Sequence, residues 1–183
     1  DHFGFEERHH LNADYVAVMC EITKNNLVRK GHDFARIHIT GQPVFDNIIE
    51  LMNKYNREEL CKQNDLDPLK KYILLGSSRH FTEEIVESII VTIEKFKPEY
   101  EMIIKPHPGE NPALYNRLIV NYPNVHLYTD VDIRQLIFIS ELIIASGEST
   151  ITLEAVLMKC PVVQLNLSVV PNLVPLFEYG VSL

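Results

Sequence analysis

Short apolar runs alternate regularly with amphipathic segments from residue 71 onward. The runs predict buried strands, which we place at residues 72–75, 101–105, 125–128, 142–145 and 161–165. The amphipathic segments predict helices, which we place at residues 82–96, 112–122, 132–139 and 149–158. Nearly continuous apolar strands separated by helices are typical of a parallel sheet covered on both faces. The pattern therefore predicts a doubly wound α/β domain with a Rossmann-like parallel sheet.

The first of these helices has the clearest signals. Thr82 precedes two glutamates, an arrangement typical of a helix N-terminus. Apolar positions then recur three and four residues apart, at Ile85, Ile89, Ile93 and Phe96. We expect these four side chains to face the core.

The beginning of the chain shows a shorter pattern of the same kind. We expect strands at residues 15–19 and 36–40. Between them, Thr23 is expected to cap a helix that Gly31 ends.

The next segment predicts a connection between two parts of the chain. Its apolar positions from Phe45 to Tyr55 recur with helical spacing, which predicts one helix continuing to about Cys61. A polar stretch at residues 62–68 follows and predicts a linker.

Composition narrows the classes of function. The 183 residues suffice for one full domain. Lysine and arginine number 17 against 25 aspartates and glutamates, and the net charge of −8 argues against nonspecific binding of nucleic acid. An anionic ligand stays open, because a helix N-terminus binds phosphate without help from the net charge.

Cysteine and histidine spacing excludes further classes. The three cysteines form no CxxC pair, so we expect neither a disulfide framework nor a zinc site, and a cytoplasmic, reducing setting. The histidines show no metal-ligand spacing with carboxylates, so we expect no metal. No apolar run approaches the roughly 18 residues that a membrane-spanning helix needs.

The most informative candidate loop follows the predicted strand at residues 142–145. The strand runs into Ser146 and Gly147, and a helix begins at about Ser149 or Thr150. The backbone N–H groups at this helix start, with two hydroxyls, would form an anion site. Glu154, one turn further, could accept two hydrogen bonds from a ribose diol. The alternative is that Ser149 or Thr150 only caps a helix.

Two other loops carry candidate ligand groups at the same predicted edge of the sheet. Ser77, Ser78 and Arg79 follow the first strand and offer hydroxyls and a cation to a diphosphate. His107 lies between two prolines after the second strand and could donate to a phosphate or a sugar hydroxyl. The alternatives are ordinary turns with a solvated Arg79 and a structural histidine. No GxGxxG, P-loop, GxSxG or HExxH motif occurs.

Taken in order, these motifs resemble those of a known superfamily. Residues 36–46 resemble the interdomain segment of UDP-N-acetylglucosamine 2-epimerases and of related glycosyltransferases with the two-domain GT-B fold. Residues 74–79 with the glutamates at 83–84 resemble a loop of lipid A disaccharide synthase. Residues 145–155, continuing through 159–163, resemble the nucleotide-binding helix of that enzyme and of the epimerases.

The resemblance implies a domain organisation. Residues 1–43 would be the tail of an N-terminal GT-B domain, and 44–70 an interdomain helix and linker. Residues 71–183 would form a C-terminally incomplete nucleotide-sugar-binding domain. The rest of the N-terminal domain, which in this fold binds the acceptor and supplies most acid and base groups, would be a required partner. We therefore expect this chain alone to be inactive.

The resemblance also implies roles for residues. Glu154 would hold the ribose, and Ser146, Gly147, Ser149 and Thr150 would hold the diphosphate. The donor substrate would be a UDP-sugar, with no cofactor, and a CDP-linked donor stays open. Members of this fold are usually metal-independent, so the resemblance implies that no metal ion is needed.

Two departures from the epimerases favour a glycosyltransferase of glycan or surface polysaccharide biosynthesis. Where the epimerases carry a His-Arg-Arg-Glu motif, residues 78–81 read Ser-Arg-His-Phe. Their PVHLNP loop becomes Lys-Pro-His-Pro-Gly-Glu-Asn-Pro at residues 105–112. The alternatives are a 2-epimerase and a non-catalytic α/β binding domain. A lipid-linked acceptor, and with it a peripheral membrane location, also stays open.

Overall fold

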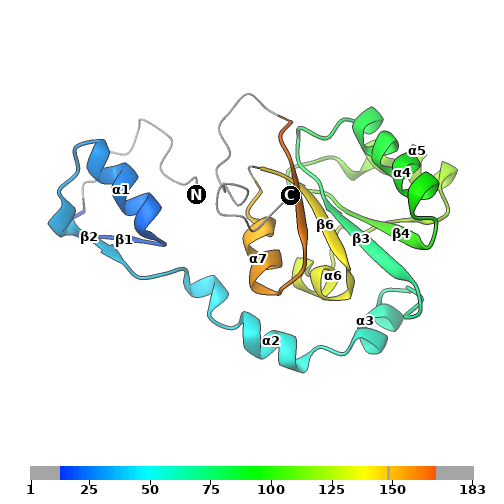
Figure 1. Cartoon of the computed structure of the whole chain (residues 1–183), viewed down its shortest axis with the longest axis horizontal. Helices are drawn as coiled ribbons and strands as arrows, with labels where there is room; N and C mark the ends of the chain where they lie inside the picture. The colour runs from blue at the N-terminus through cyan, green and yellow to red at the C-terminus, as the bar shows by residue number, and fades with distance from the viewer. Residues whose placement is uncertain (1–12, 148, 168–183) are drawn as a thin grey trace. The chain divides into compact units, whose positions relative to one another are not determined.

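The computed structural model describes residues 13–147 and 149–167 (Figure 1). The chain divides into two compact units, Asp1–Asn47 and Ile48–Leu183, and each is described by itself. The sequence at residues 177–183 also predicts the start of another β/α step, and these residues lie outside the described ones.

The first unit contains a parallel pair of strands and a helix. The two predicted strands are present as β1 (Val16–Val18) and β2 (Ile37–Ile39), and Val16 pairs with Ile37. Helix α1 (Glu21–Arg29) packs its Leu27 against the strands. A 3-10 turn η1 (Phe34–Arg36) precedes β2.

The predicted N-cap of α1 is wrong, and its predicted end is confirmed. The helix begins after Cys20, so Thr23 lies inside it rather than at its start. The extended backbone of Cys20, at φ −154°, sets this boundary without a side-chain cap. Gly31 adopts φ +91°, which is favourable for glycine, and its N–H bonds to the Val28 carbonyl.

The single helix predicted up to about Cys61 is two helices in the structure. A 3-10 turn η2 (Pro43–Phe45) precedes α2 (Ile48–Lys54), and α3 (Arg57–Gln63) follows. The break has a local cause, because the Asn56 side chain accepts a hydrogen bond from the Glu59 N–H at 3.2 Å and caps α3. The stretch predicted as a linker is partly helical, and its Leu66 is buried.

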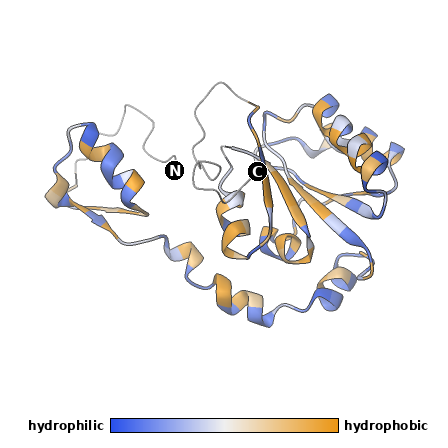
Figure 2. Ribbon diagram, in the orientation of Figure 1, coloured by the Kyte–Doolittle hydropathy of each residue, from blue (hydrophilic) through white to orange (hydrophobic). Residues whose placement is uncertain are grey.

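The second unit contains the predicted parallel sheet (Figure 1). Its strand order is β5-β4-β3-β6-β7, and every adjacent pair is parallel. The strands are β3 (Lys71–Gly76), β4 (Tyr100–Lys105), β5 (Val125–Leu127), β6 (Leu142–Ser146) and β7 (Val162–Leu165). They are mostly hydrophobic along their length, as Figure 2 shows. The chain builds outward from β3 through β4 and β5 and then returns to the other side of β3, so strand order reverses between β3 and β6.

Helices cover both faces of this sheet (Figure 1). On one face, α4 and α5 share a core with the strands, and on the other α6 packs beside α7. The elements are α4 (Glu83–Phe96), η3 (Pro112–Tyr115), α5 (Asn116–Asn121), α6 (Ile133–Ile139) and α7 (Ile151–Leu157). The helix predicted at 112–122 therefore starts as a 3-10 turn. In the part of the chain that the structure describes, no helix is both long and apolar enough to cross a bilayer.

The N-cap predicted for α4 is confirmed, and its predicted apolar face is shifted. The Thr82 hydroxyl accepts from the Ile85 N–H at 3.4 Å. The buried positions are Val86, Ile90 and Ile93, whereas Ile85 and Ile89 pack at the edge of the core. Phe96, in the last turn, stays 66% exposed, and the Lys95 ammonium lies 5.1 Å from its ring centroid.

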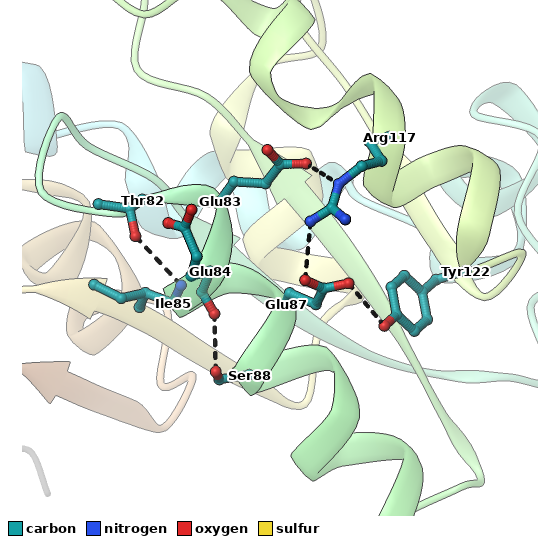
Figure 3. Close-up of polar contacts among 8 residues, drawn as sticks. All are labelled: Thr82, Glu83, Glu84, Ile85, Glu87, Ser88, Arg117 and Tyr122. Carbon is teal, nitrogen blue, oxygen red and sulfur yellow. Dashed lines mark hydrogen bonds and ion pairs between the residues drawn. The ribbon is translucent and has the colours of Figure 1, made fainter.

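A polar clamp joins α4 and α5 (Figure 3). The Arg117 guanidinium of α5 donates to Glu83 at 2.5 Å and to Glu87 at 2.9 Å. The Tyr122 hydroxyl donates to Glu87 at 3.1 Å. These contacts hold α5 beside α4.

Candidate functional site

Two of the predicted ligand loops meet where the strand order reverses. The Ser78 hydroxyl, in the loop after β3, donates to the hydroxyl of Ser146, the last residue of β6, at 3.3 Å. Just before them, Gly76 of β3 lies opposite Ala145 of β6 in the strand register. In an open parallel sheet, ligands bind beyond the carboxyl ends of the strands at such a reversal.

Gly76 makes room for the start of α7. A Cβ at this position would lie 2.8 Å from Cδ1 and 3.2 Å from Cγ2 of Ile151, the first residue of α7. Both distances are shorter than ordinary contacts, so a side chain at this position would force Ile151 to shift, and glycine lets α7 lie this close to the end of β3. The sequence shows a glycine after an apolar run, but the reason for it lies 75 residues away.

The loop between β6 and α7 uses part of the hydrogen-bonding capacity that we expected to be free. The Ser149 N–H donates to the Ser146 carbonyl at 3.0 Å, so this amide is not bare. The Gly147 N–H donates to the Leu165 carbonyl of β7 at 3.3 Å. Thr150 occupies the N-cap position of α7, but its side chain makes no capping hydrogen bond and is exposed. Thr150 therefore does not act as a side-chain cap of α7.

Glu154 lies in α7 and is paired with a residue of α6. The Arg134 Nε donates to Glu154 Oε2 at 2.7 Å, and the two side chains are 17% and 16% exposed. The hydrogen bond to Glu154 raises the pKa of Arg134. Sequence reasoning missed Arg134, because nothing in the local pattern connects it to a glutamate on another helix.

Ser77 faces the interior rather than the edge of the sheet. It is 5% exposed, and its hydroxyl donates to Glu110 Oε1 at 3.0 Å. Its N–H donates to the Lys105 carbonyl of β4 at 3.0 Å. By contrast Arg79, two residues on, is exposed, and its Nε donates to Nε2 of His80 at 3.4 Å.

His107 is exposed in the loop after β4 and held at two atoms. Its N–H donates to Glu110 Oε2 at 2.7 Å, and its ring Nδ1 accepts from the Gly109 N–H at 3.1 Å. The structure thereby links His107 to Ser77 through Glu110. Sequence reasoning missed Glu110. The only local signal was its position three residues after His107, which is close enough for its carboxylate to accept from the His107 N–H.

The described residues contain no group of three or more His, Cys, Asp and Glu side chains that could hold a metal ion. The predicted site residues offer hydroxyls, backbone amides, one arginine (Arg79), one histidine (His107) and one carboxylate (Glu154). Such a set suits the phosphates and the ribose of a nucleotide.

The chain matches one protein family over most of its length. The family model described as UDP-N-acetylglucosamine 2-epimerase matches residues 9–168. That range includes all the loops described above. No match is found among curated proteins.

Solved structures share the fold of this chain. The UDP-GlcNAc 2-epimerase of Methanocaldococcus jannaschii is 23% identical, with a TM-score of 0.65 over 84% of this chain. The MnaA protein of S. aureus is 19% identical, with a TM-score of 0.70 over 93% of this chain. The wall teichoic acid polymerase TagF is 18% identical, with a TM-score of 0.59 over 84% of this chain. The chain covers 45%, 46% and 39% of these three proteins respectively, which is less than half of each.

These likenesses confirm the predicted fold class, a Rossmann-like parallel α/β domain of the GT-B fold. The family match spans both loops that meet between β3 and β6. This chain belongs to the UDP-N-acetylglucosamine 2-epimerase family.

Proposed function

We propose that the second unit binds the nucleotide diphosphate of a UDP-sugar at the carboxyl ends of β3 and β6. The observation that carries this proposal is the hydrogen bond between Ser78 and Ser146, which brings two hydroxyl-rich loops together where the strand order reverses. Nucleotide ligands of structural relatives support it. The M. jannaschii enzyme was solved with UDP-GlcNAc and UDP, the Neisseria meningitidis 2-epimerase with UDP-GlcNAc, and S. aureus MnaA with UDP.

The diphosphate would contact the hydroxyls of Ser78, Ser146 and Thr150 and the exposed guanidinium of Arg79. Hydroxyl donors and a cation suit phosphate oxygens. These donors can bind a diphosphate locally even though the net charge of the chain is −8. Gly147 and Ser149 would shape the loop, since their amides donate within the protein. Ser77 is buried and would stabilise the loop through its hydrogen bond to Glu110 without contacting the ligand.

The ribose would bind Glu154 in this proposal. Arg134 holds Oε2 of this carboxylate, which leaves Oε1 to accept a hydrogen bond from the ribose diol. A carboxylate held in place by a cation loses little freedom when the ribose binds, which favours affinity.

For the whole protein we propose a glycosyltransferase. Bond breaking at the anomeric carbon releases UDP, and the donors around Ser78 and Ser146 would stabilise the charge that develops on the departing diphosphate. The fold shared with the polymerase TagF supports a transferase. So does the Ser-Arg-His-Phe sequence at residues 78–81, where the epimerases carry His-Arg-Arg-Glu. The groups that bind the acceptor, and most acid and base groups, would lie in the N-terminal domain of this fold. The reaction would belong to the biosynthesis of a surface polysaccharide.

A 2-epimerase is the second candidate for the whole protein. The family match over residues 9–168 favours it. It would use the same nucleotide site, because an epimerase of this family and a transferase both act on a UDP-sugar.

Incubation of the full-length protein with UDP-GlcNAc tests the proposal. Proton and phosphorus NMR would follow UDP release and the appearance of a 2-epimer, with and without a membrane fraction as the source of acceptor. UDP release that depends on the acceptor supports a transferase, and a 2-epimer supports the second candidate. UDP binding without either product favours a non-catalytic domain, and failure to bind UDP, CDP or UDP-GlcNAc rejects the nucleotide site.

A further inference from the structure

Glu110 accepts hydrogen bonds from three segments of the second unit. Its Oε1 accepts from the Ser77 hydroxyl and from the Tyr115 hydroxyl, each at 3.0 Å. Its Oε2 accepts from the backbone N–H of His107 at 2.7 Å. One carboxylate thus joins the loop after β3, the loop after β4 and the turn η3.

Two of these donors are buried and have few other options. Ser77 is 5% exposed and Tyr115 is 1% exposed, and their hydroxyl oxygens also lie within hydrogen-bond distance of each other, so two protons serve three contacts. Burial, against the opposing effect of the Ser77 hydrogen bond and with the help of Glu110, raises the pKa of Tyr115 to about 12, so it remains a neutral hydroxyl. Without an acceptor at position 110, one of these two hydroxyls can still donate to the other, but the second hydroxyl and the His107 N–H lose their partner, and a buried donor without a partner is costly.

The ring of His107 is oriented by its neighbour Gly109. The Gly109 N–H donates to Nδ1 at 3.1 Å, and an N–H can donate only to a nitrogen that carries no proton. The neutral imidazole therefore carries its proton on Nε2. A Cβ at position 109 would lie 3.3 Å from Nδ1, so glycine permits this close contact.

We propose that Glu110 is a positioning residue of the nucleotide-sugar site. By fixing the backbone of His107 against the end of β3, it lets this exposed side chain present its Nε2–H to a phosphate oxygen of the UDP-sugar. The inference rests on the proposed function. It assigns no direct ligand contact to Glu110, which acts through His107 and Ser77.

Three variants of the full-length protein separate positioning from charge and from general stability. Glu110→Ala removes the acceptor. Glu110→Gln keeps one, because its carboxamide oxygen can accept from His107 while its NH₂ donates to the rotating hydroxyls of Ser77 and Tyr115. The matched control is Glu87→Ala, since Glu87 also accepts from a tyrosine hydroxyl and an N–H donor, in the clamp between α4 and α5 (Figure 3).

Two readouts decide the outcome: UDP affinity by calorimetry, and the tautomer of His107 by ¹⁵N NMR, assigned with His107→Gln. We expect an Nε2–H tautomer in the ligand-free wild type and in Glu110→Gln, and a mixture of tautomers in Glu110→Ala. UDP affinity should fall about tenfold in Glu110→Ala, by less than about threefold in Glu110→Gln, and stay unchanged in Glu87→Ala.

Two results would overturn the inference. One is an Nδ1–H tautomer in the wild type, which remains measurable even if Glu110→Ala does not fold. The other is a Glu110→Ala protein with wild-type UDP affinity and tautomer. A wild type that binds no UDP counts against the proposed function instead, and the ligand-free tautomers still decide whether Glu110 positions His107.

Discussion

Arg134 of α6 and Glu154 of α7 form an ion pair in which Nε and Oε2 are 2.7 Å apart. Both side chains are about five-sixths buried, at 17% and 16% exposure, so solvent screens this pair less than a surface pair. The pair therefore fixes the one carboxylate proposed to hold the ribose.

Substitution of these two residues should separate pairing from ribose binding. Glu154→Gln and Arg134→Gln should both lower the melting temperature, because each breaks the ion pair. Glu154→Gln should also weaken UDP about tenfold, whereas Arg134→Gln should weaken it less than about threefold. Calorimetry with UDP and 2′-deoxy-UDP measures both. If Glu154→Gln left the preference for UDP over 2′-deoxy-UDP unchanged, the ribose role would be excluded.

A methyl group added at Gly76 should push α7 away from β3. Gly76→Ala places a Cβ 2.8 Å from Ile151 Cδ1, and such overpacking costs about 1–3 kcal/mol. The double variant Gly76→Ala/Ile151→Val should recover part of this loss, since valine lacks the Cδ1 atom. Urea denaturation of the two single variants and the double variant gives the coupling free energy between positions 76 and 151. If the two single effects simply add in the double variant, the contact between Gly76 and Ile151 does not govern the packing of α7.

Glu101 of β4 should make the fold sensitive to acid. It pairs with His126 at 2.9 Å and with Lys70 at 3.0 Å. Burial alone would raise the pKa of Glu101, but the hydrogen bonds from His126 and Lys70 outweigh burial and hold it below its ordinary value of 4.5. A carboxyl with a lower pKa in the folded state stabilises the fold above its unfolded pKa, and that stabilisation disappears as the pH falls through the folded pKa.

Glu101→Gln should therefore flatten the fall of the melting temperature below about pH 4.5. The exposed Glu99→Gln serves as the control and should keep the wild-type fall. Calorimetry between about pH 6 and pH 3 measures these curves. An acid dependence identical in Glu101→Gln and the wild type would assign the effect to other groups.

Arg57 should hold the α3 segment to the sheet domain. Its guanidinium donates to the carbonyls of Lys70 at 2.8 Å and Ile139 at 3.2 Å, and also to Pro68. Arg57→Met should cost about 1–3 kcal/mol of unfolding free energy, because these carbonyls lose a charged donor. Lys62→Met, on the same helix but in an exposed pair with Glu58, should leave the urea midpoint unchanged. Equal effects of the two substitutions would contradict this role of Arg57.

The sheet could be predicted from the sequence because the strands of a covered parallel sheet are nearly continuous apolar runs. The run at 72–75 became β3 and the run at 142–145 became β6, each within one residue at either end. The caps Thr82 and Asp132 lie where the expected helices begin, because a side-chain cap is a local interaction. Two caps were exceptions. Helical spacing of the apolar positions concealed the cap at Asn56 that breaks the predicted helix, and Thr23 lies inside α1 rather than at its start.

The candidate site could be predicted only in part, since its polar contacts join distant segments. Ser78 and Ser146 were each recognised in a loop after a strand, but their contact depends on the strand order. Glu110 and Arg134 act on Ser77 and Glu154, which lie 33 and 20 residues away. No periodic pattern records such pairs, because they form only when the sheet and its helices are assembled.

A crystal structure of the full-length protein with UDP measures the nucleotide site most directly. The account predicts diphosphate oxygens within hydrogen-bond distance of the Ser78, Ser146 and Thr150 hydroxyls, and the ribose diol on Glu154. A diphosphate bound away from the carboxyl ends of β3 and β6, with Glu154 contacting Arg134 alone, would contradict it.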